Sequence, residues 1–396
     1  MDSKDYTPDA QGVLVPIAGT HPRHGPWEHV AFVPHPLPAE TPDLSKRTFN
    51  AVASARAALA ALDSTARQLP NPALLRQSTL RREAQSTSAL EGTYAPLEAV
   101  LAADEEADQS DSNLFEVLNY VRAAERAFAW QADGRPLTIG MVADLHKDLV
   151  WLTKADNDQA GRVRTIQVMI GSHAGARVQD ARFVPPPGGS GLEQQLRDLL
   201  DWMRSNHDQD IDPVVAAGMA HYQFETLHPF NDGNGRIGRL LVVLHLMQAG
   251  ILIEPTLTVS PWFEARRADY YDRLLAVSRA GAWDAWIRFF ADGLAVSADD
   301  TASRLRSLLA VQSQLKAKVR EARPRLLADN AMLLVDFALA RPIFTVRQAE
   351  RHLGVTYARA NRLVGQLISA GVLRQYDDAV YDRRFTAPEV LAVLLR

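Results

Sequence analysis

Residues 228–239, with the sequence HPFNDGNGRIGR, constrain what this chain can fold into more than any other stretch. Gly233 and Gly235 flank Asn234, so the backbone can turn tightly there and point successive N–H groups at an anion. The apolar run over residues 237–247 then predicts a helix, and the N-terminus of a helix favours phosphate. The stretch therefore predicts a buried helix that begins at a polyphosphate site.

Four side chains in this stretch have chemistry suited to such a site. Arg236 and Arg239 are three residues apart and share one helix face, where two guanidinium groups can hold separate phosphoryl groups. Asp232 is a hard oxygen ligand suited to Mg²⁺ that bridges phosphates. His228 is the only group of the stretch with a neutral form near pH 7 that can accept a hydroxyl proton. The alternative interpretation is a solvated turn between two helices.

The order of these residues resembles the Fic (Fic/DOC) family signature, H-x-F-x-D/E-G-N-G-R-x-x-R, and every specified position is filled. The resemblance implies a protein adenylyltransferase, which uses ATP and Mg²⁺ or Mn²⁺ to transfer AMP to a Ser, Thr or Tyr hydroxyl of a target protein. It implies that His228 deprotonates the hydroxyl, Asp232 holds the metal and Phe230 anchors the loop. The residues that it assigns to the nucleotide are Gly233, Asn234, Gly235, Arg236 and Gly238, with Arg239 on the γ-phosphate.

Composition limits the classes of protein to which the chain could belong. With 396 residues the chain is long enough for two or three domains, and 47% hydrophobic with 23% charged residues is ordinary for a globular protein. A net charge of −4 argues against global attraction to nucleic acid, and the absence of cysteine excludes disulfides and thiolate metal sites. Neither a signal-peptide pattern nor an apolar run of about 20 residues is found, so we expect a cytoplasmic protein without membrane contact.

The first part of the chain divides into an arm and two helices. Residues 1–45 are rich in proline and predict an extended arm on the surface of a domain. Alanine and leucine at helical spacing predict a helix over residues 51–69, and a second helix is expected from Pro72 to about Glu91, where Gly92 supplies a stop. This arrangement resembles the region that precedes many Fic domains.

The second of these helices ends in the sequence Thr87-Ser-Ala-Leu-Glu91-Gly92, which resembles the family's inhibitory motif S/T-x-x-x-E-G/N. Alone the pattern is weak, because any Thr and Glu four residues apart before a glycine would match it; an ordinary helix end is the alternative. Together with the signature, the resemblance implies that Glu91 pairs with Arg239 and occupies the guanidinium that the γ-phosphate needs. We therefore expect an autoinhibited enzyme.

Further helices follow from apolar positions at helical spacing. They are expected over residues 114–129, 139–152, 192–203 and 213–227, the last of which leads directly into the signature. The acidic run at residues 102–113 predicts a solvated loop. The catalytic part of the chain is therefore expected to be mainly helical.

One short region has a β pattern. Residues 164–170 and 181–184 are rich in strand formers and predict a two-stranded hairpin. The resemblance places the family's flap here, which aligns the target backbone by strand addition. The flap residues would be Ala181, Arg182, Phe183 and Val184. The alternative is an edge hairpin without a function.

Aromatic residues after the signature admit two interpretations. Tyr270 and Tyr271 fall in an expected helix, and the resemblance implies paired aromatics against adenine there, with core packing as the alternative. Core positions are predicted for Trp283, Trp286, Phe289 and Phe290. Before the signature, His146 falls in the helix expected over residues 139–152 and is predicted to be a core or interface residue rather than a metal ligand.

Residues beyond about 328 predict a separate unit. Helices are expected over residues 331–340, 345–355 and 356–370, followed by strands over 371–374 and 380–385. This order resembles a winged helix-turn-helix domain. Arginines on the third helix and in the wing could contact DNA phosphates, but acidic residues interleave with them, so protein contact or structural support is the favoured interpretation. These arginines are Arg359, Arg362, Arg383 and Arg384.

The sequence thus predicts a mainly α protein, with a Fic-type helical domain, a small β-hairpin flap and a C-terminal winged helix-turn-helix domain. The target would be a protein with an exposed hydroxyl; self-modification and a homodimer are left open. The rival hypotheses are a DNA-binding regulator whose Fic site senses ATP, and removal of AMP or transfer of another nucleotide at the same site. The expected parts are 1–110 (arm and inhibitory helix), 111–300 (catalytic domain), 301–327 (helical linker) and 328–396 (winged helix).

Overall fold

The fold is mainly helical, with two small antiparallel sheets, over the part of the chain that a computed structural model describes. The described residues are 2–21, 25–68, 72–103, 111–171, 177–205, 210–322 and 328–396. Most of the expected acidic loop, residues 104–110, lies outside them. No helix in the described ranges is both long and apolar enough to cross a membrane.

Two buried helices form the centre of the catalytic region. Helix α7 (Pro213–Leu227) begins with proline at its first turn, and the Asp212 side chain accepts a hydrogen bond from Val214 N–H. Helix α8 (Asn234–Gln248) is buried along almost its whole length, which confirms the sequence prediction. Helix α4 (Ser112–Ala132) packs against α8. Because α7 ends where the signature begins and α8 starts within it, the signature is the connection between the two central helices.

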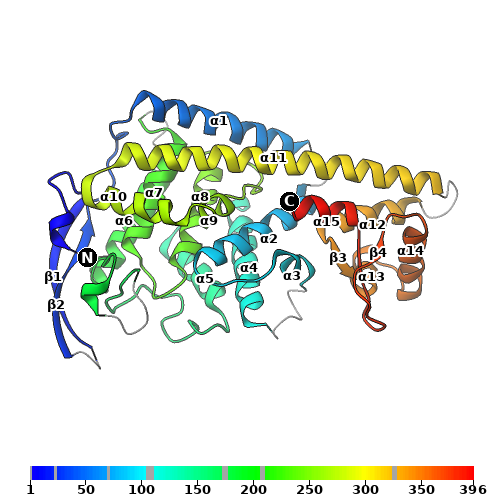
Figure 1. The fold of residues 1–396 in the computed structure, drawn as a ribbon, viewed down its shortest axis with the longest axis horizontal. Helices are drawn as coiled ribbons and strands as arrows, with labels where there is room; N and C mark the ends of the chain where they lie inside the picture. The colour runs from blue at the N-terminus through cyan, green and yellow to red at the C-terminus, as the bar shows by residue number, and fades with distance from the viewer. Residues whose placement is uncertain are drawn as a thin grey trace.

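Helices α1 (Lys46–Arg67) and α11 (Trp283–Ala322) lie side by side along the length of the molecule (Figure 1). Helix α11 has 40 residues and passes through residue 300, where the sequence-based division placed a domain boundary. Its first turns bury the aromatic residues predicted as core: Trp283, Trp286, Phe289 and Phe290. The remaining catalytic-region helices are α3 (Leu97–Ala102), α5 (Ile139–Val150), α6 (Ser190–Arg204), α9 (Ser260–Glu264) and α10 (Arg267–Ala280).

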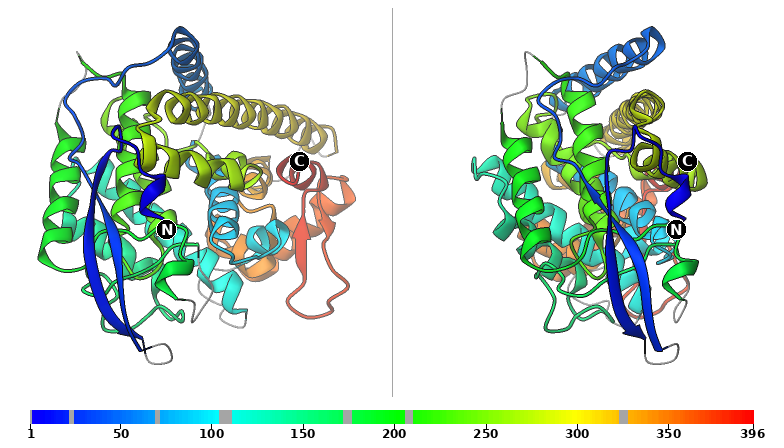
Figure 2. Two further views of the ribbon diagram at one scale, coloured as in Figure 1. Left: turned by 60° about the vertical axis from the view of Figure 1, so that its left-hand side comes forward. Right: turned by 90° about the vertical axis from the view of Figure 1, so that its left-hand side faces the viewer.

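The N-terminal region differs from the extended arm that was predicted. After a short 3-10 helix, η1 (Ser3–Asp5), strands β1 (Gly12–His21) and β2 (Gly25–Pro34) form an antiparallel hairpin with unbroken register. The prediction was wrong because the prolines argued against strands. In a two-stranded sheet each strand has a free edge, so a proline, which lacks the N–H donor, is tolerated there. Figure 2 shows this hairpin as a long ribbon on the outside of the helices.

The segment predicted as inhibitory forms helix α2 (Pro72–Leu90). Gly92 follows with φ +93°, the left-handed conformation expected of a helix-stop glycine. The helix packs against α4 and α9, and also against α12 (Ala328–Ala340) of the C-terminal unit. Its buried Glu83 accepts hydrogen bonds from both the backbone N–H, at 3.0 Å, and the hydroxyl of Ser260. The helix is therefore anchored in the core well before its last turn.

The flap hairpin predicted over residues 164–170 and 181–184 is reduced to one β-bridge, between Ile170 and Phe183. Strand β2 supplies the reason, because Phe32 N–H donates to Val184 O at 2.9 Å and draws the second segment toward the N-terminal hairpin. A short 3-10 helix, η2 (Val178–Asp180), precedes that segment. The flap is thus a short irregular pair supported by β2.

The C-terminal unit has helices α13 (Val346–Leu353) and α14 (Tyr357–Ser369) within the predicted ranges, while α12 begins at Ala328, before the predicted start at residue 331. Its sheet has the order β3 (Ile343–Thr345), β5 (Arg384–Thr386), β4 (Arg374–Gln375). Strand β3 and the last helix, α15 (Pro388–Leu394), were not predicted. The end of α15 rests on two arginines, because Arg304 on α11 donates to Val393 O and Arg82 on α2 donates to Leu394 O. The winged-helix assignment stays a prediction.

Candidate active site

His228 ends helix α7 in the left-handed conformation, with φ 49°. Its N–H still donates to Phe224 O at 3.0 Å, so the residue closes the last helical turn, and Pro229 prevents the helix from continuing. Burial, and then the nearby charge of Arg164, lower the pKa of His228 to about 4. The imidazole is therefore neutral at pH 7, as a general base must be.

The loop after His228 is held by a reciprocal clamp. Phe230 N–H donates to Asn234 Oδ1 and Asn234 Nδ2 donates to Phe230 O, both at 2.8 Å. Phe230 is buried and stacks on His146 with ring centroids 4.0 Å apart, which confirms its predicted anchoring role. His146 Nδ1 accepts from Gly161 N–H, so its Nε2 donates to Asp232 O at 3.0 Å. The side chains of Asn234 and His146 thus stabilise the loop through hydrogen bonds to its backbone.

Arg239 and the inhibitory motif are joined by three hydrogen bonds. Arg239 Nε donates to Thr87 Oγ1 at 2.7 Å, and its Nη2 donates to Thr87 O at 3.0 Å and to Glu91 Oε1 at 2.6 Å. The guanidinium is fully buried. Glu91 is thus in contact with Arg239, as expected, and Thr87 contributes the other two hydrogen bonds; the inhibitory role of this contact stays a prediction.

Glycine at position 235 makes this pairing sterically feasible. A Cβ at position 235 would overlap Glu91 Oε1 and lie 2.9 Å from Arg239 Nη1. Gly233 meets a different need, because its φ of +75° lies in the left-handed region and a Cβ there would come within 2.8 Å of Leu149. The two glycines of the turn therefore serve different purposes: Gly233 permits the turn, and Gly235 leaves space for Glu91.

Arg236 and Asp232 belong to a second charged group. Arg236 is only 2% exposed; it pairs with Glu116 on α4 and reaches Asp232 Oδ1 at 3.3 Å. Glu116 also accepts from the Thr93 hydroxyl at 2.9 Å. The Asp232 side chain is 56% exposed, so it can take a further ligand. The described ranges contain no group of three or more His, Asp or Glu side chains that could hold a metal.

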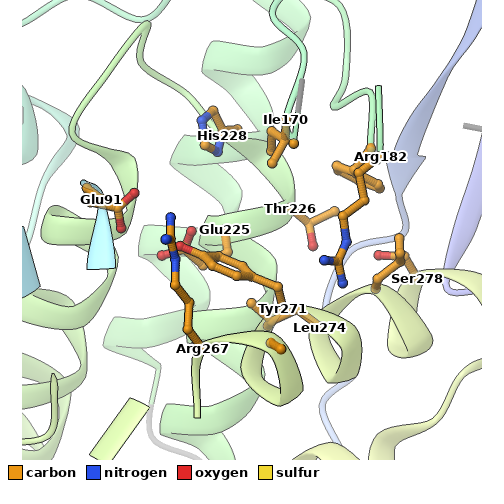
Figure 3. A pocket seen from close by; sticks show the side chains of 14 residues that line it. Glu91, Ile170, Arg182, Glu225, Thr226, His228, Arg267, Tyr271, Leu274 and Ser278 are labelled. Atoms are coloured by element: carbon orange, nitrogen blue, oxygen red, sulfur yellow. The ribbon is translucent and has the colours of Figure 1, made fainter. Parts of the chain in front are cut away.

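A cavity of about 610 Å³ lies beside His228. Figure 3 shows Glu91, His228 and Tyr271 around it, contributed by the ends of α2 and α7 and by α10. We call it the His228 cavity, and it is lined by Glu91, Ile170, Gly171, Arg182, Phe183, Glu225, Thr226, His228, Arg267, Ala268, Tyr271, Leu274, Leu275 and Ser278.

The cavity contains some of the predicted site residues and not others. His228, Glu91, Tyr271 and the flap residues Arg182 and Phe183 line it. The predicted phosphate residues do not line it, whereas Glu91, which contacts Arg239 and fills the space beside Gly235, does. The residues concerned are Gly233, Asn234, Gly235, Arg236, Gly238 and Arg239.

Three other predicted residues face the core. Tyr270 was expected beside adenine, but it is fully buried and its hydroxyl is 2.7 Å from His221 Nε2, so it is a core residue. Ala181 and Val184 of the flap are buried against β2 rather than in the cavity. The physical reason is the same in both cases: on a helix or an extended segment, neighbouring side chains point in different directions. The sequence alone therefore does not show which of two neighbouring side chains points into the cavity and which into the core.

Sequence reasoning missed several residues of the site. Glu225 lines the cavity one helical turn before His228, and a Cβ at position 238 would overlap its carboxylate, so Gly238 allows α8 to approach it. Burial raises the pKa of Glu225 to about 8, although the Arg239 charge lowers it. The i, i+3 spacing from His228 was the available signal for Glu225. Arg267 and Glu116 had no such signal, because tertiary packing alone brings them to the site.

The C-terminal arginines are partly neutralised. Arg384 Nε lies 2.7 Å from Asp377 Oδ2, and Arg383 donates to Asn361 Oδ1 at 3.4 Å. Two of the four arginines that could contact DNA phosphates therefore have protein partners in the described structure. This arrangement does not favour the DNA-binding hypothesis.

Comparison with known proteins finds similarity over two segments of the chain. Residues 49–129 match the Fic/DOC family N-terminal domain, and residues 136–246 match the Fic/DOC family domain. The crystal structure of a Fic family protein from Desulfovibrio desulfuricans G20 has a similar fold, with a TM-score of 0.54 and 21% identity over 88% of this chain and 98% of that chain. The chain thus contains a segment similar to the Fic/DOC family N-terminal domain and a segment similar to the Fic/DOC family domain.

Characterised relatives carry the name protein adenylyltransferase. The Caenorhabditis elegans protein adenylyltransferase fic-1 is 35% identical over 157 residues, which is 39% of this chain and 27% of the relative. The Nematostella vectensis protein adenylyltransferase Fic is 33% identical over 138 residues, or 35% of this chain and 28% of the relative. The matched region thus spans less than a third of each relative's length.

Proposed function

We propose that this protein is an adenylyltransferase that transfers AMP from ATP to a hydroxyl group of a target protein, and that the pairing of Glu91 with Arg239 holds it inactive. The relatives supply the reaction class, and the neutral His228 beside a cavity supplies the base. The observation that carries the proposal is the 2.6 Å contact between Glu91 Oε1 and Arg239 Nη2, because a buried guanidinium in an anion site is held by a carboxylate of the same chain.

The proposed reaction is an in-line phosphoryl transfer. His228 accepts the proton of the target hydroxyl, whose oxygen forms a bond with the α-phosphorus of ATP. The bond from that phosphorus to the oxygen bridging to the β-phosphate breaks, and pyrophosphate leaves with both bonding electrons. Little covalent work falls to the protein, so its contribution is to position the groups and stabilise charge.

The phosphates would lie where the signature turn meets α8. Backbone N–H groups at the start of α8 and the positive end of its dipole face that place. Arg239 is the one guanidinium there that Glu91 blocks, and its Nη1 is buried without a partner in the described structure. In the proposed inactive state ATP enters the His228 cavity with its γ-phosphate displaced, so the α-phosphorus is misaligned for attack.

Asp232 is the residue that would hold Mg²⁺ or Mn²⁺. Its half-exposed carboxylate fits such an ion, which keeps several waters and takes its other ligands from phosphate oxygens. Bound there, the ion would neutralise charge on the leaving pyrophosphate. His146 fixes the Asp232 backbone through its Nε2–H, so the chain itself orients the carboxylate.

The target would dock by strand addition at the flap. One side of the segment 181–184 already has a partner, since Val184 O accepts from Phe32 N–H, and Phe183 pairs with Ile170. A target strand would therefore add to the outer side of the Ile170 segment. Ile170 and Gly171 of this segment line the His228 cavity, so a strand added there would lie beside it.

Nucleotide labelling tests the proposal. Wild type, Glu91→Gly and the double variant Glu91→Gly/His228→Ala are incubated with each α-labelled NTP and Mg²⁺, alone and with a cell lysate, followed by mass spectrometry of the labelled peptides. We expect AMP on Ser, Thr or Tyr, from ATP, in Glu91→Gly and not in the double variant. Transfer of a different nucleotide, or no transfer from any NTP under either condition, would overturn it.

A further inference from the structure

Arg164 is a fully buried arginine whose donors reach four backbone carbonyls. Its Nε donates to His228 O at 2.8 Å and its Nη1 to Ile166 O at 2.9 Å. Its Nη2 donates to Pro186 O at 2.7 Å and to Leu227 O at 3.3 Å. No ion pair to Arg164 is found in the described ranges. A buried cation without a carboxylate is costly, so its carbonyl partners must be held in place around it.

These carbonyls belong to two parts of the molecule. Leu227 and His228 are the last residues of α7, where helix carbonyls lack partners and the dipole favours a cation. Ile166 and Pro186 lie on the segments that lead into and out of the flap. One planar guanidinium therefore links the end of the helix that carries His228 to both ends of the flap.

The backbone of Arg164 strengthens this link. Its N–H donates to Pro229 O and its carbonyl accepts from Gly189 N–H, both at 2.9 Å. Gly188 passes so close that a Cβ there would lie 2.8 Å from Arg164 O. The residue thus contacts three consecutive carbonyls, from Leu227 to Pro229, across the left-handed turn at His228.

We propose that Arg164 is a positioning residue for the transfer reaction, which holds the His228 backbone in its left-handed conformation and fixes it relative to the flap. The inference rests on the proposed function, because the flap is taken to align the target hydroxyl that His228 deprotonates. Base and hydroxyl then share one rigid frame. A misplacement of about 1 Å between such groups costs on the order of a hundredfold in rate.

The variant Arg164→Lys distinguishes a positioning role of Arg164 from a requirement for its positive charge alone. It keeps a buried cation with three donors, but it lacks the planar fork that spans several carbonyls at fixed angles. Arg164→Lys should therefore fold and still lose the alignment. Arg164→Gln keeps a planar donor group without the charge and should lose alignment and stability together.

Arg304→Lys is the matched control. Arg304 is also buried; it lies on α11 and donates to a carbonyl at a helix end, Val393 O of α15, at 3.0 Å. It additionally pairs with Asp300 at 2.8 Å. A general penalty for replacing a buried arginine would affect both lysine variants alike.

The variants are compared in whichever of wild type and Glu91→Gly transfers AMP faster. The single-turnover rate at saturating ATP and the ATP Kd are measured for each. We expect Arg164→Lys to lower the rate by about ten- to a hundredfold while the ATP Kd changes by less than about threefold. Arg304→Lys should leave both within about twofold of the parent. An unchanged rate in folded Arg164→Lys, or equal losses in the two lysine variants, would overturn the proposal.

Hydrogen exchange of the nucleotide-free protein gives a second measurement. In Arg164→Lys, amide exchange should rise by about tenfold or more in residues 226–230 and 166–170, and little elsewhere. Exchange unchanged in these segments would contradict the role. If both Arg164 variants fail to fold while Arg304→Lys folds, Arg164 is a stability residue and the proposal is wrong. If neither wild type nor Glu91→Gly transfers a nucleotide, the proposed function is wrong, but hydrogen exchange still tests the positioning role of Arg164.

Discussion

The Glu91 carboxylate occupies the space beside Gly235 that a side chain there would need, and from that position it contacts the Arg239 guanidinium at 2.6 Å. Glu91, Gly235 and Arg239, which come from separate parts of the chain, thus fit together sterically at this contact. The contact proposed to be inhibitory depends on a missing Cβ as much as on opposite charges. Several expected outcomes depend on this arrangement.

Glu91→Gly should raise AMP transfer, including self-modification, by at least about tenfold. A charge-assisted pair is worth roughly 1.5 to 3 kcal/mol, which corresponds to about ten- to a hundredfold in the population of the productive nucleotide pose. Glu91→Gln, which keeps the shape and removes the charge, should give an intermediate rate. Arg239→Ala should not activate, because it also removes the γ-phosphate contact. Rates are measured by label transfer from ATP, and a folded Glu91→Gly protein no faster than wild type would refute the inhibitory role.

Gly235→Ala should destabilise wild type by about 1 to 3 kcal/mol, because the new methyl group overlaps Glu91. In the Glu91→Gly background the same change should have a clearly smaller effect, since the overlapping carboxylate is gone. Chemical denaturation of the four proteins forms a double-mutant cycle that isolates the contact. Additive free energies would show that Glu91 does not fill this space in solution.

His228→Ala should abolish transfer and leave ATP affinity nearly unchanged. The imidazole acts on the hydroxyl, so its loss should lower the rate constant by roughly 10²- to 10⁴-fold. The measurement pairs single-turnover rates with calorimetric ATP binding in the faster parent. Parallel losses in rate and affinity would make His228 a nucleotide ligand instead of the base.

Asp232→Ala should raise the Mg²⁺ or Mn²⁺ concentration needed for half-maximal transfer, with partial recovery at high metal concentration. The side chain is half exposed and is the proposed protein ligand, so its removal weakens the site without removing the phosphate ligands. A metal titration of the rate checks this. Full activity of the parent in EDTA would exclude a metal from the reaction.

Glu225 should make stability fall as pH rises from about 4.5 to about 8. Burial raises its pKa from 4.5 to about 8, so across this range the native state keeps a proton that the unfolded chain has released. The unfolding free energy of wild type should therefore drop relative to Glu225→Gln as pH rises, with a slope of at most about 1.4 kcal/mol per pH unit. Denaturation curves at pH 5, 6.5 and 8 measure the difference, and curves that stay parallel would contradict the buried, protonated carboxyl.

The sequence was sufficient wherever local chemistry decides the structure. Proline after Asp212, glycine at position 92 and the apolar run in α8 each act within a few residues, and the helices that they predict are present. The pairing of Glu91 with Arg239 was also predictable, because both ends belong to motifs with a common purpose.

Tertiary packing decided the rest. The prolines of residues 1–45 argued against strands, yet β1 and β2 pair because each strand has a free edge. The predicted flap hairpin was too long, because Val184 O accepts a hydrogen bond from Phe32 of β2, which is distant in the sequence. Arg164 gave no signal at all, since its four acceptors are backbone carbonyls that any residue would carry.

Thr87, Glu91 and Arg239 belong to one chain, and α2 is fastened to the core by Glu83 and Ser260. The contact is therefore a unimolecular equilibrium, and the fraction of molecules in which it is formed does not depend on protein concentration. Dilution of the protein would leave it intact, and so would a change in the amount made. A freely diffusing inhibitor would behave differently, because its occupancy falls as it is diluted.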